Sequence, residues 1–221
     1  MSDTIGAGDW QPVDALLDRA LLGADSALAA ALADSASAGL PPIEVSPQSG
    51  QLLYLLTKIS GARRVLEIGT LGGYSTICLA RAVAAEGSVV TLEYEPRHAE
   101  VARRNLDRAG VVDRVEIVVG AALDSLPGLT GDFDLVFIDA DKENNSAYVQ
   151  WAVDLGRAGT VIVVDNVVRN GRIRHPAPDD RQARAVREML EMMGRHPRLD
   201  TAAIQTLGRK GWDGFAVALV K

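Results

Sequence analysis

Apolar positions along the chain follow two different patterns, which change near residue 61. Before this point the apolar side chains recur at helical spacing, and they predict three helices, over residues 13–23, 25–38 and 47–60. After it, short runs rich in valine and isoleucine alternate with longer amphipathic segments. These runs lack polar alternation, which is typical of strands covered on both faces of a parallel sheet.

The second pattern predicts an α/β fold. We expect strands over residues 63–68, 89–93, 115–119, 133–138 and 160–164. The segments between them predict helices over residues 74–85, 96–109, 121–126 and 144–156. Strand–helix alternation indicates a doubly wound parallel sheet, in which right-handed crossovers place all strand C-terminal ends at one edge, where ligands bind.

The C-terminal segment departs from this alternation. A polar loop over 167–179 and a helix over 180–194 precede two last strands, over 201–207 and 214–220. The short Gly-Arg-Lys-Gly sequence between them favours an antiparallel hairpin at the sheet edge. We therefore expect a Rossmann-like, doubly wound, seven-stranded and mostly parallel sheet with an antiparallel C-terminal hairpin and an N-terminal helical extension.

Length and composition fit a single α/β domain. We expect residues 1–60 to form N-terminal helices and residues 61–221 to form the α/β core of that domain. The formal net charge of −6 gives no positive field for nucleic acid. The chain has no apolar run of the roughly 18 residues that a membrane helix needs, and its N-terminus lacks the pattern of a signal peptide. We expect a cytoplasmic protein whose only cysteine, Cys78, is buried in a helix.

A glycine-rich turn joins the first predicted strand to the next helix. It runs from Glu67 to Ser75 as Glu-Ile-Gly-Thr-Leu-Gly-Gly-Tyr-Ser, and its glycines let backbone N–H groups approach a ligand. The next strand ends in Glu93, whose carboxylate can accept both hydroxyls of a ribose. The two motifs together indicate a cofactor that contains adenosine.

The residue before the first glycine bears on which cofactor this is. The negative charge of Glu67 would repel the pyrophosphate of a nicotinamide dinucleotide but attract the ammonium and sulfonium groups of S-adenosylmethionine. Alternatively, Glu67 is only a solvated charge at a strand end. The sequence favours S-adenosylmethionine, with a nicotinamide-dependent oxidoreductase as the alternative.

Oxygen-bearing side chains close two further strands. Asp139 follows the strand over 133–138, and Asp165 and Asn166 follow the strand over 160–164. In a parallel sheet these three come together, and they suit Mg²⁺, with Ca²⁺ or Mn²⁺ also possible. Alternatively, each is a turn residue or a helix cap. That alternative is easier to accept for one acidic strand end than for two.

Lys142 stands three residues after Asp139, in a chain that has 23 lysines and arginines but only four lysines. A partly desolvated amine beside a dication holds its proton less tightly and can act as a general base. The alternative is a solvated lysine at a helix start. The three histidines, at positions 98, 175 and 196, lie far from the strand ends in sequence, and we expect them to be exposed or to cap helices.

In this order and spacing, the motifs resemble the cation-dependent O-methyltransferase family, which includes animal catechol methyltransferases, plant caffeoyl-coenzyme A methyltransferases and bacterial relatives. The resemblance runs from about residue 43 to the C-terminus and includes the closing hairpin over 210–215. It implies a class I methyltransferase domain. It also implies cofactor contacts, with the methionine part lined by Val45, Glu67, Gly69, Thr70 and Ser75, the ribose held by Glu93, and the adenine near Ala121.

The resemblance implies a mechanism as well. Asp139 would serve both cofactor and metal, and Asp165 and Asn166 would complete the protein ligands of the metal. Two adjacent hydroxyls of a small molecule would chelate the metal, Lys142 would take one proton, and the oxyanion would attack the sulfonium methyl group. The alternative acceptor is a hydroxylated tRNA base, methylated by the same chemistry, although the net charge argues against nucleic acid.

Three positions depart from the animal catechol enzymes. Those enzymes carry Trp where Pro41 falls, Met near Ile43, and, where Ala216 falls, a Glu that binds the second catechol hydroxyl. The sequence therefore does not single out catechol as the acceptor. The loop over 167–179 is cationic, and it would attract an anionic acceptor such as a coenzyme A ester or RNA unless it is simply solvated; its basic residues are Arg169, Arg172, Arg174 and His175.

The predicted N-terminal helices are rich in alanine and leucine and have no obvious partner within the domain. We expect them to contribute to a homodimer and to cover part of the site.

Overall fold

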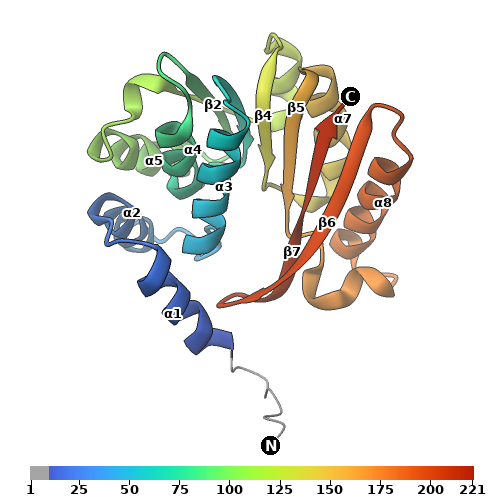
Figure 1. The fold of residues 1–221 in the computed structure, drawn as a ribbon, viewed down its shortest axis with the longest axis horizontal. Coiled ribbons are helices and arrows are strands. Elements are labelled where there is room, and N and C mark those ends of the chain that lie inside the picture. Colours follow the sequence, from blue (N-terminus) through green and yellow to red (C-terminus); the bar gives the residue numbers. More distant parts are fainter. Residues whose placement is uncertain (1–9) are drawn as a thin grey trace, which may run out of the picture.

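The computed structural model describes residues 10–221, which form one seven-stranded sheet with helices on both faces (Figure 1). The strand order is β3-β2-β1-β4-β5-β7-β6. Strands β1 to β5 are parallel, whereas β7 is antiparallel to both β5 and β6. The strands are β1 Arg64–Ile68, β2 Ser88–Glu93, β3 Val115–Val119, β4 Phe133–Ile138, β5 Gly156–Asp165, β6 Leu199–Gly208 and β7 Gly211–Val220. The expected Rossmann-like sheet with its C-terminal hairpin is confirmed.

The helices are α1 Trp10–Leu21, α2 Ser26–Ser37, α3 Pro47–Ile59, α4 Tyr74–Ala82, α5 Pro96–Arg108, α6 Ala122–Ser125, α7 Asn145–Asp154 and α8 Arg181–Arg195. Four short 3₁₀ helices join them: η1 Val112–Arg114, η2 Leu126–Gly128, η3 Lys142–Asn144 and η4 Arg169–Arg174. In the part of the chain that the structure describes, no helix is both long enough and apolar enough to span a bilayer. Residues 1–9, on which the expectation of no signal peptide falls, lie outside that part.

Successive residues of the central strands pack into two separate cores. In β1, Val65 packs with α3 and α4, whereas Leu66 and Ile68 pack on the opposite face with α7 and α8. This two-residue period is the ordinary consequence of an extended backbone. It places the side chain of Glu67 on the α4 face, and the cysteine on that face, Cys78, is buried as expected.

Some element bounds differ from those expected. The helix predicted over 121–126 has only four residues, because Pro127 cannot donate a backbone hydrogen bond and a 3₁₀ turn takes over. Strand β5 begins at Gly156 rather than at 160, since its pairing with β4 continues across a register shift. The loop predicted over 167–179 contains the 3₁₀ helix η4.

The N-terminal helices differ in how firmly they are attached. Helix α2 packs on α4 and α5 and is tied to them by the pairs Arg81–Asp25, at 2.5 Å, and Arg108–Asp34, at 2.6 Å. Helix α3 packs along α4. The expectation that these helices lack a partner within the domain is therefore wrong for α2 and α3. Helix α1 is different, because none of its residues 10–21 is buried.

Candidate active site

The predicted site residues gather at the C-terminal edge of the parallel strands, where the strand order reverses. From β1 the chain passes to β2 and β3 on one side and then returns to β4 on the other. The ends of β1 and β4 therefore have crossover connections that diverge, and such a switch point is where doubly wound sheets bind ligands.

Gly69 ends β1 in a conformation with φ of +104°. A Cβ atom at this position would lie 2.0 Å from the carbonyl oxygen of Asp139, so no side chain fits between the ends of β1 and β4. Gly73, with φ of +84°, begins α4 in the left-handed region. The glycines thus bring the turn into direct contact with the β4 end that carries Asp139.

Glu93 holds the glycine-rich turn in place. Its Oε2 accepts the backbone N–H groups of Thr70, at 3.2 Å, and Leu71, at 2.7 Å. Its Oε1 accepts the N–H of Glu95 at 3.0 Å and lies 3.2 Å from Nδ1 of His98. The carboxylate is 6% exposed at the end of β2. It is therefore oriented by the protein before any ribose binds.

One of the three histidines, His98, lies at the predicted site, and the other two do not. His98 is half-buried and contacts Glu93 instead of being exposed or capping a helix, so the expectation for it is wrong. His175 is exposed and His196 is the C-cap of α8, as expected. His98 follows Glu93 by only five residues, and the first turn of α5 brings its ring back to that carboxylate, so this short spacing was the signal that sequence reasoning missed.

Glu67 is fully buried, so it is not a solvated charge at a strand end. Burial raises its pKa to about 7, although three hydroxyl hydrogen bonds partly oppose this. The donors are Ser75 Oγ at 2.6 Å, Thr76 Oγ1 at 2.5 Å and Thr91 Oγ1 at 2.6 Å. Sequence reasoning missed Thr76 and Thr91. The clue to Thr91 was a polar residue inside the apolar run of β2.

The other cofactor positions lie close to this hydrogen-bonded unit. Thr70 Oγ1 is 2.6 Å from Thr91 Oγ1, which joins the turn to β2. Ala121 follows Gly120, whose N–H donates to the backbone carbonyl of Glu93 at 2.9 Å, so Ala121 lies near the end of β2. Val45 is 7% exposed and lies in the segment before α3.

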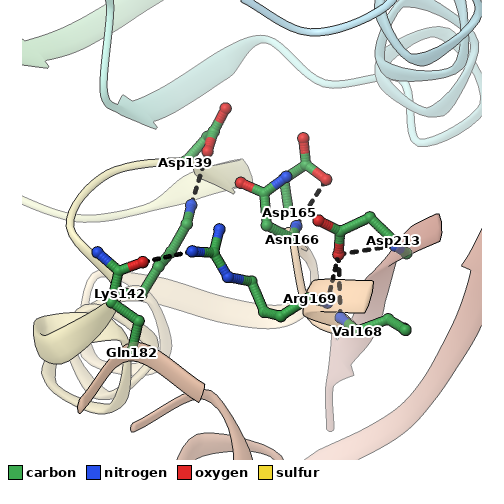
Figure 2. Close-up of polar contacts among 9 residues, drawn as sticks. Asp139, Lys142, Asp165, Asn166, Val168, Arg169, Gln182 and Asp213 are labelled. Atoms are coloured by element: carbon green, nitrogen blue, oxygen red, sulfur yellow. Dashed lines mark hydrogen bonds and ion pairs between the residues drawn. The ribbon is translucent and has the colours of Figure 1, made fainter. Parts of the chain in front are cut away.

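Asp139 and Asp165 stand on adjacent parallel strands, after the paired residues Ile138 and Val164. Lys142 is 6% exposed, and its Nζ donates to Asp139 Oδ1 at 2.7 Å (Figure 2). Burial, together with the carboxylate of Asp139, raises the pKa of Asp165 to about 7. The structure therefore brings together two carboxylates that are short of compensating positive charge.

These residues fit a divalent cation. Asn166 has φ of +60°, and its N–H donates to Asp165 Oδ1 at 2.7 Å. Two carboxylates and an amide oxygen are hard donors, and a dication would neutralise the charge that Lys142 leaves uncompensated. Nowhere in residues 10–221 do three His, Cys, Asp or Glu side chains gather as a metal site, so the amide is an essential part of this set.

Asp213 of β7 fixes the loop that follows Asn166. Its Oδ1 accepts the N–H groups of Val168, Arg169 and Gly214, each at 3.0 Å. The Arg169 guanidinium donates to Gln182 and extends toward the Lys142–Asp139 pair (Figure 2). Sequence reasoning noted the Trp-Asp-Gly segment only as part of the closing hairpin and did not assign this role to Asp213.

A pocket of about 300 Å³ opens above Asp165 and Asn166. Its other walls come from α1, the segment before α3, and the tip of the β6–β7 hairpin. The apolar lining residues are Leu17, Ile43, Val45, Leu52, Leu207 and Phe215. Of the three positions that depart from the animal enzymes, only Ile43 lines this pocket; Pro41 is exposed elsewhere, and Ala216 is fully buried in the core.

Comparison with known proteins gives a consistent result. A family model described as O-methyltransferase matches residues 25–215. The chain is 65% identical over 218 residues to a catechol O-methyltransferase from Mycobacterium tuberculosis, and the match covers 96% of this chain and 99% of the relative. A catechol O-methyltransferase from Niastella koreensis is 44% identical over 216 residues, or 96% of this chain and 98% of the relative.

Among solved structures, the O-methyltransferase TomG from Streptomyces achromogenes, in complex with S-adenosylmethionine, superposes with a TM-score of 0.94. The two chains are 43% identical, and the match covers 99% of this chain and 100% of TomG.

Proposed function

The chain belongs to the O-methyltransferase family and uses S-adenosylmethionine, and we propose that it methylates one of two neighbouring hydroxyls of a small molecule held by a divalent metal ion. Membership of this family favours S-adenosylmethionine over the nicotinamide cofactor, the alternative that the sequence left open. The further parts of the proposal are the metal, Mg²⁺ in the first place, the class of acceptor, and the roles of individual residues.

One observation carries the proposal. Asp139 and Asp165 lie side by side on adjacent strand ends, with Lys142 bound to one of them, and the pocket opens onto Asp165 and Asn166. A pocket that places an apolar wall opposite hard oxygen donors suits an acceptor with an apolar ring and two polar oxygens. Its volume of about 300 Å³ favours a small one.

The roles of the residues follow from their positions. Asp139, Asp165 and Asn166 would hold the divalent ion, which when bound would acidify a neighbouring hydroxyl. Lys142 Nζ, once it has left its ion pair with Asp139 and released its own proton to solvent, would accept the proton of that hydroxyl as a neutral amine. The hydroxyl oxygen then forms a bond to the methyl carbon as the carbon–sulfur bond of S-adenosylmethionine breaks, which leaves neutral S-adenosylhomocysteine. Glu93 and the glycine-rich turn align the donor, and alignment supplies much of the rate.

The acceptor class is supported by the relatives as well as by the pocket. Two relatives are named catechol O-methyltransferases. The absence of a carboxylate at Ala216 does not count against a catechol-like acceptor in this chain, because that position lies in the core. A single ring with two adjacent hydroxyls, or a caffeoyl-type side chain on it, is the acceptor we propose.

Chelation tests the role of the metal. Methyl transfer to a ring with two adjacent hydroxyls should fall by about 100-fold or more in excess EDTA, and added Mg²⁺ should restore it, since the ion supplies several kcal/mol of charge stabilisation. Ca²⁺ and Mn²⁺ are compared in the same assay. Full activity in the chelator would show that the metal has no role.

A matched pair of acceptors tests the two-hydroxyl requirement. The same ring with only one hydroxyl should be methylated at a small fraction of the rate, because it offers a single oxygen to the proposed metal site. Equal rates for the two rings would show that two adjacent hydroxyls are not required, and the proposed methyl transfer itself would still stand.

A further inference from the structure

Helix α1 forms one wall of the acceptor pocket, and yet it is not held there by burial. Asp14 and Leu17 line the pocket. Within residues 10–21 none is buried, and Val13, Leu16 and Leu21 are 52%, 56% and 68% exposed. An element with so little buried apolar surface loses few contacts when it moves away, so it belongs to the least stable part of the fold.

Polar contacts tie α1 to two elements, the tip of the β6–β7 hairpin and helix α3. The backbone N–H of Arg209 donates to Asp14, and its Nη2 lies 2.7 Å from Asp18 Oδ2. The other oxygen of Asp18 accepts Nε2 of Gln48, on α3, at 2.9 Å. Asp14 and Asp18 are one helical turn apart, so α1 presents both to the same side. Figure 1 shows the hairpin tip reaching toward α1.

The chain next to α1 allows it to move as a unit. Residues 22–25 are not helical, and Gly23 is exposed, with nothing within 4 Å of where a Cβ atom would stand. On the far side of this segment α2 is anchored by Arg81 and Arg108. An open glycine-containing segment that leads into an anchored helix is the arrangement of a hinge.

We infer that Arg209 is a positioning residue that limits acceptor size, because its side chain holds α1 as a wall of the pocket through Asp18. The bond from its backbone N–H to Asp14 is kept when the side chain is substituted. This inference rests on the proposed function, since it concerns the acceptor of the same site. With α1 in place, the pocket is bounded at about 300 Å³. With Arg209 released, the side formed by Asp14 and Leu17 opens, and acceptors with several rings fit.

The strength of this attachment suits such a role. The side chains of Arg209 and Asp18 are 54% and 20% exposed. An ion pair this accessible to solvent is weak and is screened by salt. The attachment of α1 through the Arg209 side chain is therefore expected to loosen as ionic strength rises.

Acceptor preference is the first test. The unaltered chain, Arg209→Ala and Arg209→Lys are compared with a single-ring vicinal diol and a three-ring vicinal diol. Arg209→Ala should raise KM for the small diol and shift the kcat/KM ratio toward the large diol by about threefold or more, in keeping with a weak ion pair. Arg209→Lys should keep most of the original ratio. KM for S-adenosylmethionine should not change.

Arg195→Ala is the matched control, because Arg195 is an exposed arginine on α8 whose side chain is 75% exposed, outside the pocket lining. It should leave the ratio as it is. An unchanged ratio in Arg209→Ala, or an equal rise in KM for the cofactor, would overturn the inference.

Hydrogen exchange gives a measurement that needs no acceptor. Amides of residues 10–21 should exchange faster in Arg209→Ala than in the unaltered chain, and those of α2 should not. Equal exchange rates in α1 contradict the inference even if the enzyme is active. If the unaltered chain methylates neither diol, the proposed acceptor class is wrong, whereas the exchange result still decides whether Arg209 holds α1.

Discussion

Glu67 accepts hydrogen bonds from three hydroxyls and has no exposed surface, whereas Arg209, at the hairpin tip, pairs with Asp18 in contact with solvent. The donor side of the site is built on the ends of parallel strands, and its polar groups are buried and hydrogen-bonded to one another. The acceptor side is built on α1, a loop and a hairpin tip. The residues proposed to hold the methyl donor and to carry out the transfer are thus fixed by buried hydrogen bonds, whereas the walls proposed to meet the acceptor are exposed and can be changed at little cost to the fold.

The largest expected effect is the loss of activity when the proposed base, Lys142, is removed. In Lys142→Met, kcat should fall by about 10³-fold, because general base catalysis contributes roughly 10²–10⁴. Affinity for S-adenosylmethionine, measured by calorimetry, should change little. Lys58→Met is the control, since Lys58 is an exposed lysine over the ring of Tyr54. A fall in kcat of less than tenfold would show that another group takes the proton.

The buried carboxylate predicts a pH-dependent stability. Burial raises the pKa of Glu67 to about 7 in the folded state, whereas the unfolded chain releases this proton near its ordinary pKa of 4.5. The contribution of Glu67 to the free energy of unfolding therefore decreases as pH rises from 4.5 to 7 and is constant above that. Glu67→Gln removes this decrease and should be more stable than the unaltered chain at pH 8, by roughly 3 kcal/mol at most.

Urea unfolding without cofactor, at pH 5 and at pH 8, measures this effect. The difference between Glu67→Gln and the unaltered chain should be small at pH 5 and larger at pH 8. Glu100→Gln, at an exposed position on α5, should show no such change. A difference that is the same at both pH values would mean that Glu67 is ionised in the folded protein throughout.

The smallest expected effect concerns His98, at the edge of the donor side. Because His98 only supports Glu93, His98→Ala should raise KM for S-adenosylmethionine by about threefold, which is typical of losing one hydrogen bond, and should leave kcat unchanged. His175→Ala, at an exposed position, should change neither constant. A fall in kcat for His98→Ala would place His98 closer to the reaction than its contact with Glu93 implies.

The two sides also differ in how far the sequence predicts them. The sequence predicts Glu93, Asp139 and Asp165 because each stands at the end of an apolar strand, and parallel strands bring their ends together without further information. It predicts Glu67 because this carboxylate stands just before the first glycine of the turn. The tie between Asp213 and the loop after Asn166 joins residues 44 and 45 positions apart. The ties between Arg209 and α1 span 191 and 195 positions. No local pattern marks either end of such contacts.

The packing of the N-terminal helices is also a contact that no local pattern predicts. Their sequence shows no obvious partner within the domain, but α2 and α3 pack against α4. The homodimer expected from these helices stays a prediction, now concentrated on the exposed apolar residues of α1. Sedimentation at micromolar concentration measures it, and a monomer there would contradict it.

Gly69 has a consequence for motion. Because a Cβ atom there would lie 2.0 Å from the carbonyl oxygen of Asp139, the glycine-rich turn and the end of β4 are in backbone contact. Packed backbone of this kind fluctuates only slightly and fast, whereas hinged elements, which we infer α1 to be, move further and more slowly. With the donor on this turn and the metal on Asp139, as proposed, the path of the methyl group keeps its length while acceptor and product exchange at a rate set by α1.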